Sequence, residues 1–256
     1  MSVAPLAGKR ILVTRPREQA AGLASLISEE GGEPILFPAI EIAAVADLRQ
    51  FYAVADRLEQ FDLAIFISPT AVQRALGLLE GRRWPKRVRV AAVGGGSKRE
   101  LEQRGFAGVV APSQDEADSE ALLALPELAS VRGQSIVIFR GQGGRAVLGD
   151  MLSERGARIE YAECYRRIRP AVSPREPEWA REALDAVTVS SSEGLANLVT
   201  LLGAWRRDWL RESALFVPHP RVAAEAARLG AREAIIAGSG DREVARALIA
   251  YFRAAK

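Results

Sequence analysis

The stretch from Ile136 to Arg145 reads Ile-Val-Ile-Phe-Arg-Gly-Gln-Gly-Gly-Arg and sets the pattern for the whole chain. Its first four residues are β-branched or aromatic, which is typical of a buried strand. Glycines and arginines follow at once, and the next residues place Val147, Leu148, Met151 and Leu152 on one helical face. This order predicts a strand, a tight loop and a helix. Such a loop leaves backbone N–H groups unpaired at the positive end of a helix, where they can bind an anion.

The same order of strand, loop and helix recurs along the chain. Strands that alternate with helices predict parallel sheets in an α/β architecture. About ten strands are too many for one small doubly wound domain, so we expect two domains. The expected strands cover residues 11–14, 34–38, 63–67, 88–93, 108–111, 136–139, 158–166, 186–189, 214–217 and 233–237, and the side chains of residues 158–166 alternate in character. Helices are expected at residues 71–79, with Pro69 well placed as the first helical residue, from about Lys98 to Arg104, from residues 118–120 onward, and at residues 179–184. Residues 170–177 hold three prolines and are the most linker-like segment.

An internal repeat supports two similar domains. Residues 11–15 match residues 136–140, which lie 125 positions later. Residues 65–68 match residues 187–190 at a distance of 122 positions, and residues 92–94 match residues 216–218 at 124. Three units that recur in the same order at nearly constant spacing indicate a duplicated α/β unit.

The composition bounds the function. The chain has 256 residues with a net charge of +3, which suits an acidic small molecule but is too weak to indicate nucleic acid. It has one cysteine, Cys164, and one histidine, His219, so an internal disulfide is impossible and a His/Cys metal site is disfavoured. No apolar run is long enough for a signal peptide or a membrane span, and we expect a cytoplasmic protein that binds neither membrane nor nucleic acid.

Six loops follow the expected strands, and they supply backbone N–H groups, hydroxyls and arginines. Ligands of parallel α/β sheets bind at the carboxyl ends of the strands, where all six loops lie. The plain alternative is that Ser68, Ser190 and Ser191 only cap helices and that the glycines only form turns. The six loops cover residues 14–17, 68–70, 94–97, 140–145, 190–192 and 218–221.

Two further interpretations are weaker. Gly141, Gly143 and Ala146 fit a loose dinucleotide fingerprint, but Glu160 falls inside the next strand and not at its end. A Ser-His-Asp triad would need His219 as its base, and that residue lies between two prolines with no orienting carboxylate indicated.

Taken together, these loops resemble those of the uroporphyrinogen-III synthase family over nearly the whole chain. The resemblance is carried by the order and spacing of residues 12–16, 65–68, 92–94, 140–145, 155–157 and 163–167. It implies an α/β fold with two similar parallel-sheet, flavodoxin-like domains, a two-stranded linker and a cleft between the domains. Domain 1 would comprise residues 1–38 and 170–256, domain 2 residues 46–162, and the linker strands residues 39–45 and 163–169.

The resemblance also implies an activity. The family is a lyase of porphyrin biosynthesis that closes linear hydroxymethylbilane to uroporphyrinogen III, with loss of water and inversion of ring D. It uses neither a metal nor an organic cofactor, and we expect a monomer. The substrate is a tetrapyrrole polycarboxylate, which suits loops rich in N–H groups and arginines. The alternative is a non-catalytic two-domain module that senses a tetrapyrrole or another anion.

Site residues follow from the same resemblance. Tyr165 matches a cleft tyrosine and is the candidate acid for the departing hydroxyl group. The family pattern is broken at Val222, where a hydroxyl is usual, so no donor role is expected there. The expected substrate-binding residues are Thr14, Arg15, Ser68, Gly94, Ser97, Arg140, Gly141, Gly143, Ser190, Ser191 and Arg221.

Overall fold

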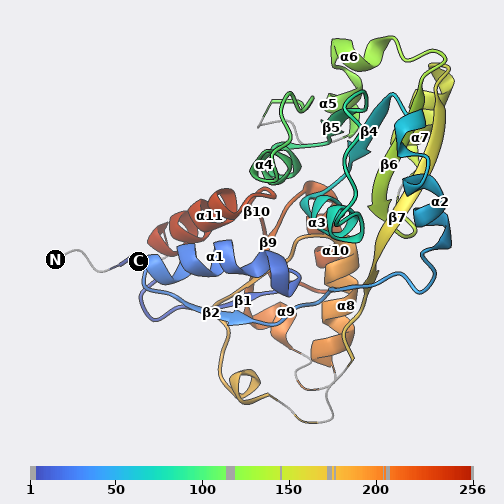
Figure 1. Ribbon diagram of the computed structural model, residues 1–256. Helices are drawn as coiled ribbons and strands as arrows, with labels where there is room; N and C mark the ends of the chain where they lie inside the picture. Colours follow the sequence, from blue (N-terminus) through green and yellow to red (C-terminus); the bar gives the residue numbers. More distant parts are fainter. Residues whose placement is uncertain are drawn as a thin grey trace. The chain divides into compact units, whose positions relative to one another are not determined.

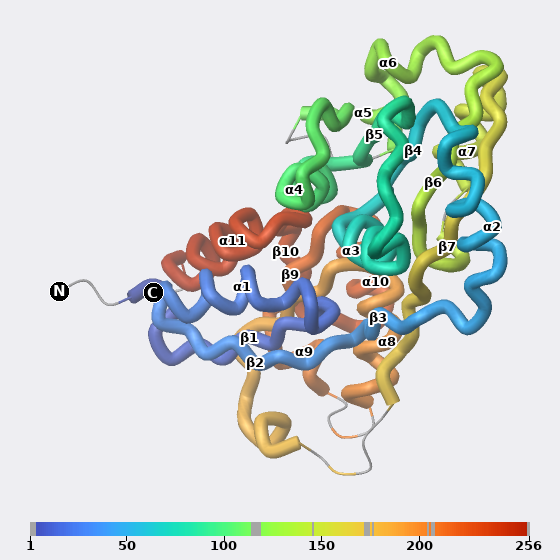
Figure 2. Tube along the Cα trace, viewed as in Figure 1, coloured from blue at the N-terminus to red at the C-terminus, as the bar shows by residue number. Residues whose placement is uncertain are grey.

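The chain folds into two compact units. The computed structural model describes residues 4–113, 119–144, 146–171, 175, 177–203, 205 and 208–254. Unit 1 comprises Met1–Glu41 and Ile168–Lys256, and unit 2 comprises Ile42–Arg167. The chain therefore passes from unit 1 into unit 2 once and returns once (Figure 2). Of the expected linker strands, residues 39–41 and 168–169 belong to unit 1, whereas residues 42–45 and 163–167 belong to unit 2.

Unit 1 is built on a five-stranded sheet in the order β10-β9-β8-β1-β2. All neighbouring strands are parallel, and the order is that of a flavodoxin-like sheet. The strands are β1 (Arg10–Val13), β2 (Glu33–Leu36), β8 (Ala186–Thr188), β9 (Ala214–Val217) and β10 (Ala234–Ile236). The helices are α1 (Arg17–Glu29), the 3-10 turn η2 (Glu178–Arg181), α8 (Ser192–Gly203), α9 (Trp209–Glu212), α10 (Pro220–Arg228) and α11 (Asp241–Ala254).

The sheet of unit 1 is buried on both faces. Ile11 and Val13 of β1 pack with the apolar residues of α1 and α11, and Leu12 packs with those of α8 and α10. Helices α1 and α11 lie side by side (Figure 1). Successive side chains of a strand point to opposite faces, so a strand covered on both sides needs an unbroken apolar run. This accounts for the apolar run that the sequence carries at residues 11–13.

Unit 2 has its own five-stranded sheet in the order β3-β7-β6-β4-β5, and the pairs β5-β4, β4-β6 and β6-β7 are parallel. Val110 adds an isolated parallel bridge to Ala91 of β5. The strands are β3 (Glu41–Ala43), β4 (Leu63–Phe66), β5 (Arg89–Ala92), β6 (Ser135–Gly141) and β7 (Arg158–Ile168). The helices are α2 (Arg49–Ala55), η1 (Leu58–Gln60), α3 (Pro69–Leu78), α4 (Gly95–Gln103), α5 (Ser119–Leu123), α6 (Pro126–Ala129) and α7 (Val147–Glu154).

The two faces of the unit 2 sheet carry different cores. One face is aliphatic, with Ile65 and Ile138 packed against leucines of α5, α6 and α7. The other face is aromatic: Phe66 stacks on Phe139 at 4.7 Å between ring centroids, and Phe51 of α2 meets Phe139 edge-on at 6.1 Å. Burial of these rings holds α2 against the sheet.

The internal repeat is visible in the strand registers. Arg10 pairs with Glu33 in unit 1, and Ser135 pairs with Arg158 in unit 2, so both partners lie 125 positions later. Along the sheets, the order β9-β8-β1-β2 in unit 1 corresponds to β5-β4-β6-β7 in unit 2. The first half of the chain therefore supplies β1 and β2 to unit 1 and β4 and β5 to unit 2. The second half supplies β8 and β9 to unit 1 and β6 and β7 to unit 2.

Two helix predictions and one strand prediction were wrong, and one helix was missed. The strand expected at residues 108–111 is reduced to the isolated bridge at Val110. The helix expected from about Lys98 begins at Gly95. Its first turn lies close to α3, since a Cβ added at Gly96 would lie 3.3 Å from Pro69. The helix expected at residues 179–184 is only the turn η2, since the carbonyls of Trp179 and Ala183 accept hydrogen bonds from the Arg10 side chain. The helix α9 was not expected at all.

Two expectations lie partly outside the described residues. Asp118, expected to open a helix, is not among them, and neither is part of the proline-rich segment at residues 170–177. Within the part of the chain that the structure describes, no helix has the length and apolar character needed to cross a membrane.

Candidate active site

Tyr165 lies at the carboxyl end of β7, beside the ends of β6 and β4. The pairing of β6 with β7 slips by one residue there: Arg140 pairs with Glu163, and Gly141 pairs with Tyr165. Cys164 is therefore an extra residue, and both it and Tyr165 are buried, at 2% and 4% exposure. An extra residue of this kind bends a strand and redirects the side chain that follows. The irregularity thus directs the Tyr165 ring against the loop after β6.

Two neighbours fix the Tyr165 side chain. Its hydroxyl lies 3.2 Å from the Ser68 Oγ at the start of α3. Its ring lies so close to Gly141 that a Cβ there would be 2.7 Å from Cε2 and Cζ. Its carbonyl accepts a 2.7 Å hydrogen bond from the Gln142 N–H, which ties the loop to β7. Tyr165 therefore contacts both Ser68 and Gly141, and all three residues were expected in the site.

The Arg140 side chain folds back into the loop that follows β6. Its guanidinium lies over the Tyr161 ring at 4.6 Å from the centroid and donates to the carbonyls of Gly141 and Gly144. The residue is 6% exposed, and a Cβ at Gly144 would lie 2.9 Å from Nη2. Arg140 therefore holds the loop in shape from within. Arg145 at the end of the same motif lies outside the described residues.

The middle of this loop is shaped by a glycine and a carboxylate. Gly143 has φ +69°, a left-handed conformation that favours glycine. Its N–H donates to the Glu163 side chain at 3.3 Å. A cavity of about 210 Å³ opens beside the loop and is lined by Val45, Asp47, Gln50, Phe51, Gln142 and Glu163.

The loop after β5 brings a second helix N-terminus to the same edge. Gly94 precedes α4 in an extended conformation, and Ser97 lies buried in the first turn. The close approach of Gly96 to Pro69 places the first turns of α3 and α4 side by side. Two helix N-termini favour negative charge nearby, so this edge of unit 2 is suited to an anion.

In unit 1, the loop after β1 is held by internal contacts. The Thr14 hydroxyl is buried and donates to the Thr188 carbonyl at 2.7 Å. Arg15 forms an ion pair with Asp241 and donates to the Ser239 carbonyl at 2.8 Å. Both side chains therefore shape the carboxyl edge of this sheet from inside.

The two other loops of unit 1 are more open. Ser191 accepts from the Gly194 N–H at 3.0 Å as α8 begins, which is the capping role weighed against ligand binding. Ser190 is exposed, and so is Arg221 in the first turn of α10. These two side chains are the members of the expected set in unit 1 that present polar groups to solvent.

Sequence reasoning missed three residues of these loops: Tyr161, Glu163 and Asp241. Tyr161 stacks on Arg140, Glu163 accepts from the loop, and Asp241 pairs with Arg15. Glu163 could have been found from the sequence, because its carboxylate stands two residues before the candidate acid Tyr165. The other two contacts depend on tertiary packing.

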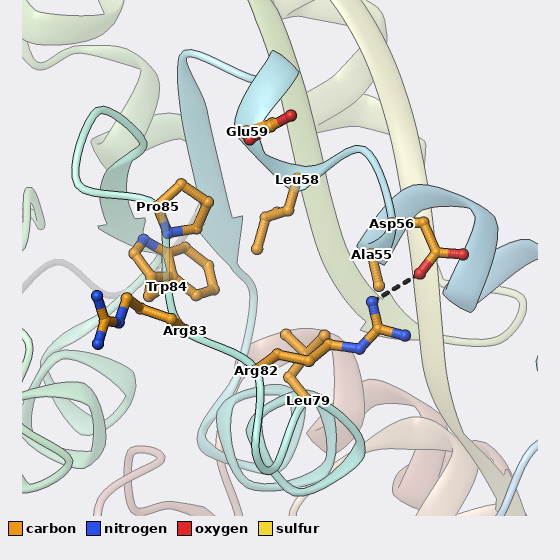
Figure 3. A pocket seen from close by; sticks show the side chains of 9 residues that line it. All are labelled: Ala55, Asp56, Leu58, Glu59, Leu79, Arg82, Arg83, Trp84 and Pro85. Carbon is orange, nitrogen blue, oxygen red and sulfur yellow. Dashed lines mark hydrogen bonds and ion pairs between the residues drawn. The ribbon is translucent and has the colours of Figure 1, made fainter.

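Two further features are not part of the candidate site. A cavity of about 240 Å³ lies between α2 and the segment from Arg82 to Pro85, where Arg82 donates to Asp56 at 2.6 Å (Figure 3). That segment precedes β5, so the cavity lies toward the amino end of that strand, opposite the end that Tyr165 occupies on β7. Burial raises the pKa of the Cys164 thiol to about 12, so this cysteine is not a nucleophile at neutral pH.

The fold and these loops define an α/β protein with two flavodoxin-like units, whose candidate ligand loops follow parallel strands. A family model described as uroporphyrinogen-III synthase HemD matches residues 21–243. The chain belongs to the uroporphyrinogen-III synthase family. It is 34% identical over 238 residues to the uroporphyrinogen-III synthase of Escherichia coli K12, covering 91% of this chain and 96% of that protein. The corresponding protein of Chlorobaculum parvum is 28% identical over 204 residues, with coverages of 77% and 80%.

Solved structures share the fold. A mutant uroporphyrinogen III synthase from Thermus thermophilus superposes with a TM-score of 0.61 at 19% identity, covering 97% of this chain and 99% of that one. The Helicobacter pylori uroporphyrinogen-III synthetase gives a TM-score of 0.61 at 12% identity, with coverages of 97% and 100%. The predicted α/β fold and family are confirmed.

Proposed function

We propose that this chain is a uroporphyrinogen-III synthase, which closes hydroxymethylbilane to uroporphyrinogen III with loss of water and inversion of ring D. The observation that carries the proposal is the 34% identity to the Escherichia coli protein over 96% of its length. The loop edge of unit 2 supports it, because two helix N-termini and glycine-rich backbone suit a polycarboxylate. A cytoplasmic monomer without metal or organic cofactor, and without nucleic acid or membrane as a partner, is part of the same proposal.

Tyr165 is the proposed acid. Departure of the terminal hydroxyl group needs a proton, and a phenol held within reach can supply it. Ser68 and Gly141 hold the Tyr165 side chain in one place, as an acid requires. The remaining proposed contacts to substrate are the loops that carry Thr14, Arg15, Gly94, Ser97, Arg140, Gly143, Ser190, Ser191 and Arg221.

An assay that separates isomers I and III tests the proposal. Hydroxymethylbilane closes to the wrong isomer without an enzyme, so formation of isomer III reports catalysis directly. We expect isomer III from the wild-type chain and a loss of about tenfold to a thousandfold for Tyr165→Phe. Full activity of Tyr165→Phe would remove Tyr165 as the acid. Tight binding of the product without any isomer III would favour the sensor alternative.

A further inference from the structure

The Ser68 hydroxyl makes two contacts at the start of α3. Its Oγ accepts a hydrogen bond from the Ala71 N–H at 3.0 Å, which caps the helix. The same oxygen lies 3.2 Å from the Tyr165 hydroxyl. Pro69 follows as the first helical residue and holds the backbone in this geometry.

The first hydrogen bond favours one direction for the second. A serine hydroxyl has one proton and two lone pairs, and one lone pair faces the Ala71 N–H. A hydroxyl that already accepts one hydrogen bond becomes a better donor in the next. We propose that Ser68 donates its proton to the Tyr165 oxygen and so leaves the Tyr165 proton for the substrate. This inference rests on the proposed role of Tyr165 as the acid.

The hydrogen bond from Ser68 to Tyr165 matters most when the terminal hydroxyl group of the substrate departs. The carbon–oxygen bond of the terminal hydroxymethyl group breaks with electrons supplied by the pyrrole nitrogen, which leaves an azafulvene cation. The leaving oxygen takes the Tyr165 proton and departs as water, so negative charge develops on the Tyr165 oxygen. Ser68 donates to that oxygen, and the positive end of α3 lies behind it. Ser68 is thus a positioning residue that acts through Tyr165, and not a ligand of a substrate carboxylate.

Three variants separate helix capping from proton donation. Glycine is nearly as good an N-cap as serine but has no hydroxyl, so Ser68→Gly should lower kcat about tenfold to a hundredfold without changing KM. Ser68→Thr keeps the hydroxyl and should stay within about threefold of wild type. If Ser68→Gly does not fold, Ser68→Asp replaces it, because an ionised carboxylate caps the helix but cannot donate.

A double-mutant cycle with Tyr165→Phe decides between the roles. Once the Tyr165 hydroxyl is gone, Ser68→Gly should cause no further loss of kcat, because its effect passes through that group. Thermal unfolding of each variant checks that the fold is intact. Losses that multiply in the double variant, a rise in KM, or wild-type kcat for Ser68→Gly would overturn this proposal while Tyr165 remained the acid. Wild-type turnover of Tyr165→Phe alone would instead remove the acid itself, and this inference with it.

Discussion

Gly141→Ala tests how tightly the Tyr165 ring is held. The added methyl group would lie 2.7 Å from Cε2 and Cζ of Tyr165 and 3.1 Å from its hydroxyl oxygen. Carbon atoms normally pack at about 3.5–4.0 Å, so the ring would have to move by about 1 Å. Overpacking of this size costs about 1–3 kcal/mol, and a displacement of about 1 Å in a catalytic group costs about a hundredfold in rate.

Two measurements follow this change. The isomer-resolved assay should show kcat for uroporphyrinogen III reduced about a hundredfold. Thermal unfolding followed by circular dichroism should show a midpoint lower by about 2–12 °C, the shift that about 1–3 kcal/mol produces in a chain of this size. The two effects have one cause, so they should appear together.

Gly77→Ala in α3 is the matched control. A Cβ at Gly77 meets no atom within 4 Å, so this variant should keep full activity and be slightly more stable. Removing the ring with Tyr165→Ala should also abolish the stability cost of Gly141→Ala. Wild-type turnover together with a wild-type unfolding midpoint for Gly141→Ala would refute the reasoning, because no displaced ring could then be present.

Other expectations concern the thiol, one carboxylate and metals. Burial raises the pKa of the Cys164 thiol to about 12, so this thiol should resist a disulfide reagent at pH 8 and react fully only in denaturant. Rapid reaction of the folded protein would contradict this. The Ser135 N–H and, to a lesser degree, the Arg87 ion pair lower the pKa of Asp62 in the folded protein. The ionised carboxylate therefore stabilises the fold fully above the ordinary aspartate pKa, and this stabilisation is lost as the pH falls through the lowered pKa of the folded state. Asp62→Asn should therefore be about 0.5–1 kcal/mol less stable in urea at pH 7, with the difference shrinking below about pH 4; an equal difference at both pH values would contradict this. Dialysis against a chelator should leave isomer III formation unchanged, and a loss restored by added metal would overturn that expectation.

Local patterns were enough to predict the elements that carry the site. The run at residues 214–217 corresponds to β9 residue for residue, because a strand buried on both faces must be apolar throughout. Pro69 was expected as the first residue of its helix, and α3 begins there. The repeat also had a physical basis, since both halves reproduce the same strand register.

The orientation of side chains in the loops could not be predicted in the same way. An arginine between a strand and glycines has the pattern of an exposed cation, yet Arg140 is buried. Its partner Tyr161 lies on the neighbouring strand, and which residues meet there depends on the β6–β7 register. The slip that makes Cys164 an extra residue is likewise absent from the alternating pattern of that strand. Such contacts depend on pairing between segments about twenty residues apart.

The division of each half of the chain between the two units has a consequence for synthesis on the ribosome. Ile11 of β1 pairs with Ala186 of β8, which is made 175 residues later. At a translation rate of about 5–20 residues per second, β8 is synthesised roughly 9–35 s after β1. All strands of unit 2 have been made before β8 appears. An unpaired strand edge is a template for association with other chains. A chain truncated between β7 and β8 therefore carries all strands of unit 2 attached to a two-stranded part of the unit 1 sheet with an open edge, a form exposed to aggregation and proteolysis.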